Sequence, residues 1–188
     1  EGWSIEKSKS TWFFSKEKAA FGVMGDLGIH KADLIQYLLG EKIIEVGAFM
    51  DTLAKTDRMG SSIEIEDNAV CILKMASGAI GKMAVSWTLP LGEVNYTRLY
   101  CQDGILRIYD DSEYALIVTK NDGEGAYYKL GAIFNNEDPK PTGMIRGFVD
   151  SIINDSLVPV TAEDAYQALK VILACKESAE TGRMIKIE

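Results

Sequence analysis

Apolar residues recur at helical spacing in three segments of the chain, and each segment has a recognisable end. The predicted helices cover residues 26–39, 143–154 and 161–181. Gly40 follows the first and Gly182 the last, as glycine commonly follows a helix. Thr161 is expected to begin the last helix, because its hydroxyl can accept a hydrogen bond from the amide near Asp164.

Between the first and second helices, apolar and polar residues alternate as they do in strands. The predicted strands cover residues 43–51, 67–75, 79–88, 94–101, 105–109, 114–119 and 126–130, with a short edge strand at 184–187. Short turns such as Ser77-Gly78 join most neighbours, which must therefore pair antiparallel. We expect an α+β domain with a single, predominantly antiparallel open sheet and helices packed on one face.

The other face of this sheet is expected to be available for assembly. Residues 69–75 and 83–87 carry apolar side chains in both alternating sets, whereas a solvated face would show polar residues in one set. We therefore predict that part of this face is buried against another domain or subunit.

Length, charge and composition restrict the kinds of protein that this chain can be. The 188 residues form one domain by length, and a net charge of −8 without long basic runs argues against nucleic-acid binding. Because the sequence lacks both a membrane-length apolar run and a signal-peptide pattern, we expect a soluble, cytoplasmic protein. Cys71, Cys101 and Cys175 lie far apart in apolar surroundings, which predicts buried free thiols.

The strongest chemical candidates are Asp26 and His30, the single histidine, which share one face of the first predicted helix. Imidazoles ordinarily titrate near neutral pH, so His30 can exchange a proton with a substrate hydroxyl while Asp26 orients its ring. Two alternatives remain open: a purely structural Asp-His pair, and a carboxylate-rich metal site. Trp12 is near enough in sequence to line a cleft beside Asp26 and His30, or it is a core or interface anchor.

Two other classes of site lack their motifs. The glycines of residues 22–28 do not have the spacing of a dinucleotide-binding fingerprint. No Gly-x-Ser-x-Gly elbow marks a nucleophilic serine.

Taken together, these motifs resemble the C-terminal domain of the glucose-fructose oxidoreductase and myo-inositol dehydrogenase family of NAD(P)-dependent enzymes. The sharpest element is the run from Gly22 to Asp33, which contains Asp-x-Gly-x-His-x-x-Asp. Supporting elements are Asp67-Asn68-Ala69, Gly78 to Gly81 leading to Ser86-Trp87, Gly104 to Ile108, and the closing run from Phe148 to Arg183. Ala20-Phe21 stand where the family often has two glycines.

The resemblance implies that residues 1–188 are a C-terminal substrate-binding and oligomerisation domain. In this family NAD or NADP is bound mainly by a separate N-terminal Rossmann domain, which is absent from this sequence. The resemblance gives Asp26 and His30 roles in catalysis and, with Trp12, in binding a sugar, polyol or similar hydroxyl compound. The sequence opens at Glu1, without methionine, so we expect an inactive fragment of a dehydrogenase that assembles as a homo-oligomer. The alternative is a non-catalytic binding or assembly module.

Overall fold

The structure is a computed structural model, which describes residues 12–57, 59–89, 94–129 and 143–188. The chain divides into two compact units, one comprising residues 1–92 and 160–188, the other residues 93–159. Both contain antiparallel strands and helices, which confirms the predicted α+β class. None of the described helices is both long enough and apolar enough to cross a membrane.

The first unit contains a four-stranded antiparallel sheet in the order β3-β2-β1-β8. Its strands are β1 (Ile43–Asp51), β2 (Asn68–Met75), β3 (Ile80–Ser86) and β8 (Ile185–Lys186). The turn between β2 and β3 forms as predicted, and Gly78 has a φ of 94°, which an L side chain rarely adopts. The local turn therefore fixes the register of this hairpin.

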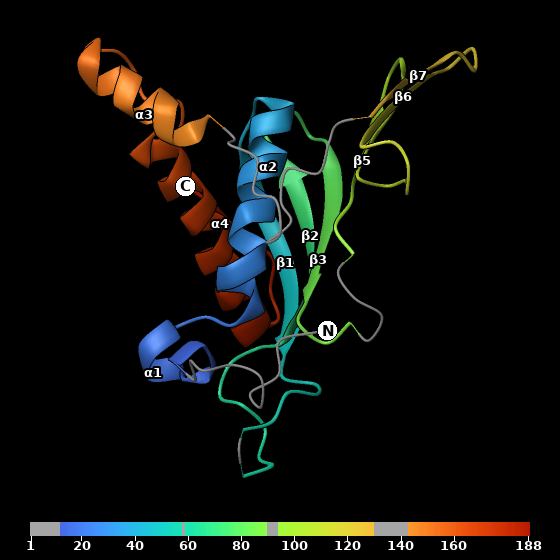
Figure 1. Cartoon of the computed structure of the whole chain (residues 1–188). Coiled ribbons are helices and arrows are strands. Elements are labelled where there is room, and N and C mark those ends of the chain that lie inside the picture. The colour runs from blue at the N-terminus through green and yellow to red at the C-terminus, as the bar shows by residue number, and fades with distance from the viewer. Residues whose placement is uncertain (1–11, 58, 90–93, 130–142) are drawn as a thin grey trace. The chain divides into compact units, whose positions relative to one another are not determined.

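Helices cover one face of this sheet (Figure 1). The helical elements are η1 (Trp12–Phe14), α1 (Lys16–Ala19), η2 (Met24–Gly28), α2 (Ile29–Leu39) and α4 (Ala162–Thr181). The long helix α4 packs on β1, α2 packs on α4, and η2 contacts β3. The face that α4 covers is the core face of the unit.

The beginning of α4 forms as its sequence predicts. The Thr161 hydroxyl accepts a hydrogen bond from the Asp164 backbone N–H at 3.2 Å, and the Asp164 carboxylate accepts one from the Thr161 backbone N–H at 2.8 Å. Val171, Ile172 and Cys175 of this helix are fully buried in the core. The capping box thus starts a helix whose apolar stripe covers the sheet.

The opposite face of the first sheet carries exposed apolar side chains together with Glu45, Lys74 and Lys82. Phe49, Val70 and Ile72 are 85%, 54% and 56% exposed, and Phe49 lies opposite Val70 in the antiparallel register. Large apolar side chains gathered on one sheet face are unusual for a surface that stays in water.

The second unit contains another four-stranded antiparallel sheet, in the order β4-β5-β6-β7. Its strands are β4 (Thr97–Cys101), β5 (Gly104–Ile108), β6 (Leu116–Lys120) and β7 (Gly125–Tyr128). Helix α3 (Met144–Ile153) belongs to the same unit, and its large apolar side chains are exposed.

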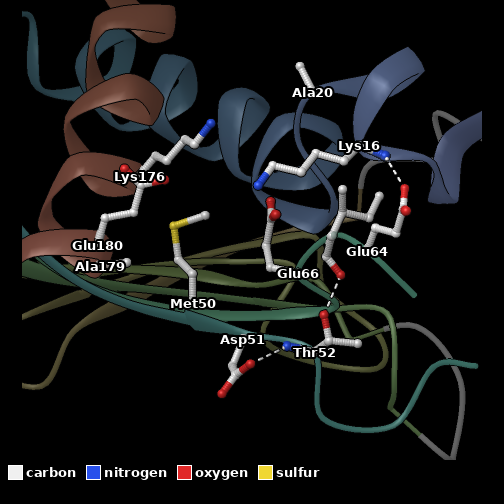
Figure 2. Close-up of a pocket in the computed structure, with 11 residues that line it drawn as sticks. Lys16, Ala20, Met50, Asp51, Thr52, Glu64, Glu66, Lys176, Ala179 and Glu180 are labelled. Atoms are coloured by element: carbon white, nitrogen blue, oxygen red, sulfur yellow. Dashed lines mark hydrogen bonds between the residues drawn. The ribbon is translucent and has the colours of Figure 1, made fainter. Parts of the chain in front are cut away.

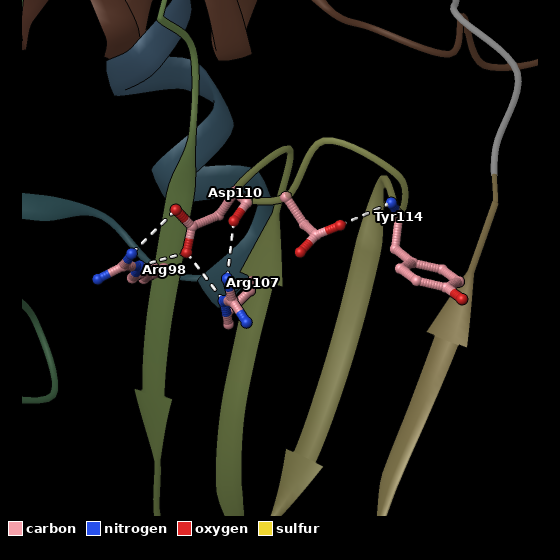
Figure 3. A network of polar contacts seen from close by, with 5 residues as sticks. Arg98, Arg107, Asp110 and Tyr114 are labelled. Atoms are coloured by element: carbon pink, nitrogen blue, oxygen red, sulfur yellow. Dashed lines mark hydrogen bonds and ion pairs between the residues drawn. The ribbon is translucent and has the colours of Figure 1, made fainter.

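Two arginines hold the loop that follows β5 (Figure 3). The Asp110 carboxylate accepts hydrogen bonds from Arg98 on β4, including one from Nη2 at 2.9 Å, and from Nε of Arg107 at 2.9 Å. Arg107 also donates to the Asp110 carbonyl at 2.7 Å. Hydrogen bonds from both guanidinium groups lower the pKa of Asp110 to about 2. A single carboxylate therefore links neighbouring strands to the loop.

Two sequence-based expectations are wrong. The described strands form two sheets rather than one, because the short turns that pair consecutive strands are missing between β3 and β4, where ten residues intervene. Cys71 and Cys175 are buried as expected, but Cys101 is exposed, because it lies at the last position of β4 beside a surface turn. The end of the strand predicted to reach Leu130 lies outside the described residues.

Candidate functional site

Asp26 lies in the π-helical turn η2, which runs directly into α2. The backbone N–H of Ile29 donates to the carbonyl of Met24, a span one residue longer than an α-helical hydrogen bond. The sequence predicted a regular helix here, and the wider turn was missed because apolar spacing does not report such local departures. Single π-turns inside helices occur frequently at functional sites.

Glu66 holds the beginning of this turn. Its Oε1 accepts hydrogen bonds from the backbone N–H groups of Gly22 at 2.8 Å and Met24 at 3.2 Å. Its carbonyl oxygen accepts one from Val23 at 2.9 Å. A Cβ on Gly22 would lie 1.9 Å from that carbonyl oxygen, so the close approach of the two segments requires glycine.

The Asp26 carboxylate is held by Trp87, the residue immediately after β3. Trp87 Nε1 donates to Asp26 Oδ2 at 2.9 Å, although the two residues are 61 positions apart. The Trp87 ring is only 5% exposed and meets the rings of Phe13 and Phe14 edge-on, at centroid distances of 6.3 and 5.7 Å. Asp26 itself is half-buried, at the border of this aromatic cluster.

His30 lies in the first turn of α2 and is exposed. Among the described residues no hydrogen bond or ion pair joins it to Asp26, whose carboxylate is directed to Trp87 instead. The described contacts therefore do not include the bond by which Asp26 would orient the imidazole, and that role stays a prediction. A half-buried carboxylate and an exposed imidazole one turn further along can each approach a ligand independently.

Trp12 lies in η1, where its ring is 46% exposed and packs against Phe13 at a centroid distance of 4.2 Å. Phe13 in turn contacts Trp87, which donates to Asp26. The structure thus connects Trp12 to Asp26 through two aromatic side chains that the site prediction did not include.

Asp67 anchors Trp87 from the other side. Its carbonyl accepts a hydrogen bond from the Trp87 backbone N–H at 2.9 Å, and its fully buried carboxylate has four donors. These are the backbone N–H groups of Leu53, Ala54 and Lys55 and the side-chain amide of Asn68, at 2.6–2.9 Å. Burial by itself raises the pKa of the Asp67 carboxyl, but the hydrogen bonds outweigh it and hold that pKa below its ordinary value.

The neighbouring Lys31 is half-buried on α2, and burial lowers the pKa of its ammonium group.

A pocket of about 220 Å³ lies elsewhere in the first unit (Figure 2). Lys16, Lys176, Glu64, Glu66 and Glu180 contribute charges of both signs to its lining. Asp26, His30 and Trp12 do not line it. Across the part of the chain that the structure describes, no three His, Cys, Asp or Glu side chains are grouped as metal ligands would be.

A family model described as the GFO/IDH/MocA C-terminal domain matches residues 2–107, which is more than half of the chain and includes Trp12, Asp26, His30 and Trp87. The chain belongs to the GFO/IDH/MocA C-terminal domain family. The family assignment made from the sequence motifs is thereby confirmed.

Relatives of this GFO/IDH/MocA C-terminal domain include the myo-inositol 2-dehydrogenase of Thermotoga maritima, which is 26% identical over 169 residues. That alignment covers 89% of this chain and 49% of the relative, so the chain spans about half the length of this curated protein.

The fold also matches solved structures. An aldose-aldose oxidoreductase from Caulobacter crescentus matches 100% of the chain and 53% of its own length, with a TM-score of 0.76 at 23% identity. A levoglucosan dehydrogenase in complex with NADH matches 100% of the chain and 56% of its own length, with a TM-score of 0.80 at 21% identity. At these identities the match establishes the GFO/IDH/MocA C-terminal fold.

The residues that sequence reasoning missed are Glu66, Asp67 and Trp87, with Phe13 and Phe14. Asp67 and Trp87 had a signal in the family motifs, in Asp67-Asn68 and Ser86-Trp87, whereas Glu66, Phe13 and Phe14 lie outside those motifs. Spacing along one helix could find Asp26 and His30, but not partners on distant strands.

Proposed function

We propose that this chain is the substrate-binding and oligomerisation domain of an NAD(P)-dependent oxidoreductase that acts on a sugar, polyol or similar hydroxyl compound. The observation that carries the proposal is the fixed Asp26 carboxylate beside an exposed imidazole, on a motif within the family-matched segment. Relatives named as dehydrogenases of myo-inositol and levoglucosan support a cyclic polyol or sugar as the substrate class.

The proposed chemistry divides the work between two side chains. Asp26 accepts a hydrogen bond from a substrate hydroxyl through the carboxylate oxygen that Trp87 does not occupy. His30 takes up the hydroxyl proton when the carbinol carbon is oxidised, and returns it in the reverse direction. Trp12 adds an exposed aromatic surface at the edge of the cluster, against which the apolar face of a sugar ring can pack.

The described residues do not fit a dinucleotide. The glycine-containing run at residues 22–28 offers no free anion site, because the Glu66 carboxylate already accepts from the Gly22 and Met24 N–H groups and would repel a phosphate. The proposal therefore assigns NAD or NADP to an N-terminal Rossmann domain outside this sequence, which would accept the hydride.

The test is to replace His30 with Ala in the complete gene product and to assay oxidation of myo-inositol and levoglucosan with NAD⁺ and NADP⁺. We expect kcat to fall by a factor on the order of 10² to 10⁴, as for loss of a general acid-base group. Because His30 is exposed, the free energy of unfolding should change by less than about 0.5 kcal/mol. Unchanged kcat in the His30→Ala protein would contradict the assignment.

The coding sequence upstream of Glu1 provides an independent test. We expect an open frame that encodes a strand, Gly-x-Gly-x-x-Gly and a helix. A start codon directly before Glu1 would favour the alternative of a non-catalytic module, whose tryptophan fluorescence would not respond to polyols.

The exposed apolar sheet face supports the oligomerisation part of the proposal. Phe49, Val70 and Ile72 form a contiguous apolar surface on adjacent strands, of the kind that subunits bury on assembly. We propose that a second copy of the protein covers it.

A further inference from the structure

Trp87 is a buried residue whose single hydrogen-bond donor meets the candidate site. An indole has a single donor, and the Trp87 N–H is committed to Asp26 Oδ2 at 2.9 Å. The rest of the ring is buried against Phe13 and Phe14. The side chain thus presents one polar atom, and that atom meets the carboxylate of the candidate site.

Trp87 is itself held at both its backbone and its ring. Its backbone N–H donates to the carbonyl of Asp67, a residue with no exposed surface whose carboxylate is anchored by four donors. The edge-on contacts with Phe13 and Phe14 restrict rotation of the indole. A donor fixed in this way holds its acceptor in one place.

We propose that Trp87 is a positioning residue for Asp26: its indole N–H holds one carboxylate oxygen so that the other faces the substrate hydroxyl. This inference rests on the proposed function, because it assigns the purpose of the bond from the role of Asp26. Among the described contacts Asp26 has no bond to His30, and its carboxylate is bonded instead to Trp87, the residue directly after β3.

Trp87 makes two contributions that substitutions can separate. The ring stabilises the fold through burial, whereas the N–H fixes the carboxylate. Trp87→Phe keeps an aromatic ring and removes the donor. Val85→Ala is the matched control, because Val85 is a buried residue two positions earlier and its truncation removes core volume without touching the hydrogen bond.

The first experiment measures kcat/KM of the complete gene product with myo-inositol and levoglucosan, using whichever gives the higher wild-type turnover. We expect kcat/KM to decrease about tenfold or more in Trp87→Phe, because a hydrogen bond to a charged group is lost. In Val85→Ala, kcat/KM should stay within about twofold of wild type. In an Asp26→Asn background, Trp87→Phe should cause little further decrease, because the two changes act through one interaction.

The outcomes of the kinetic test are distinct. Trp87→Phe with wild-type kcat/KM, beside an impaired Asp26→Asn protein, would overturn the positioning role and leave the proposed function standing. The same holds if Trp87→Phe is equally harmful with and without Asp26→Asn. Fully active Asp26→Asn and His30→Ala proteins would overturn the proposed function itself.

A second measurement does not depend on the fold tolerating Trp87→Phe. In a ¹H–¹⁵N spectrum of the wild-type protein, the Trp87 indole N–H should exchange slowly with solvent, and its resonance should move in Asp26→Asn and on addition of the substrate. An indole resonance that ignores both changes would overturn the inference.

Discussion

At the scale of single residues, the candidate site depends on contacts between segments that are distant in sequence. Glu66 binds the backbone at residues 22–24 with both its carboxylate and its carbonyl, and this leaves no space for a side chain at Gly22. The same segment then forms the π-turn that carries Asp26. Both the stability of the first unit and the position of Asp26 therefore depend on Gly22.

Gly22→Ala should destabilise the first unit. The added Cβ would lie 1.9 Å from the Glu66 carbonyl oxygen, so the two segments must separate and lose their hydrogen bonds. We expect a loss of about 2–4 kcal/mol in the free energy of unfolding, measured by urea denaturation. Gly81→Ala is the control, because nothing lies within 4 Å of its added Cβ, and it should change stability by less than about 0.5 kcal/mol. Equal effects at both positions would contradict this account.

The same residues show what the sequence could predict of the site. Asp26 and His30 were identifiable because they are four positions apart on one helix, a relation that local spacing reports. Their actual partners were not, since Trp87 reaches Asp26 across 61 positions. The predicted Asp26-His30 bond is not among the described contacts, and the contact that is present, from Trp87 to one carboxylate oxygen, joins distant segments that local spacing does not report.

At the scale of elements, hairpins were predictable and the arrangement of sheets was not. A turn such as Ser77-Gly78 is determined by its own residues, and each predicted hairpin is present in the described residues. The division into two sheets depends on a connection of ten residues, 87–96, which is longer than a hairpin turn. The Arg98-Asp110-Arg107 contacts that join β4 and β5 to their loop are also invisible to periodicity.

Those contacts predict a specific pH dependence in the second unit. The folded-state pKa of Asp110 is lowered to about 2, so its bonds stabilise the fold above the ordinary carboxyl pKa and are lost as the pH falls toward about 2. A carboxyl ¹³C NMR titration should show a midpoint near that value, and Arg98→Gln should raise it. A midpoint near 4, as in unstructured peptides, would show that the arginines do not hold Asp110.

At the scale of the whole molecule, the exposed face of the first sheet is the feature that most needs a partner. Phe49 and Val70 face each other across β1 and β2, and Ile72 continues the same surface. The sequence predicted this surface from apolar residues in both alternating sets. The sequence could not predict what covers this surface, because the spacing of apolar residues does not identify the partner.

Ile72→Lys should reduce self-association of the complete gene product. A charge at the centre of an apolar interface is buried without a partner, which strongly disfavours assembly. Sedimentation-velocity ultracentrifugation should show a shift toward smaller species. Tyr37→Lys, at an exposed residue of helix α2 on the helix-covered side, should leave the distribution unchanged. Assembly that is indifferent to Ile72→Lys would place the interface elsewhere.

The residues of the first unit lie both before and after those of the second unit in the sequence, so the first unit cannot be completed until the second has been synthesised. The ribosome delivers β1, β2 and β3 first and then all four strands of the other sheet, whereas α4 and β8 emerge last. The second sheet can pair while the inner face of the first still awaits Val171, Ile172 and Cys175. During that interval the part of the first sheet that α4 covers stays exposed, so nascent chains are vulnerable to aggregation until α4 has been synthesised.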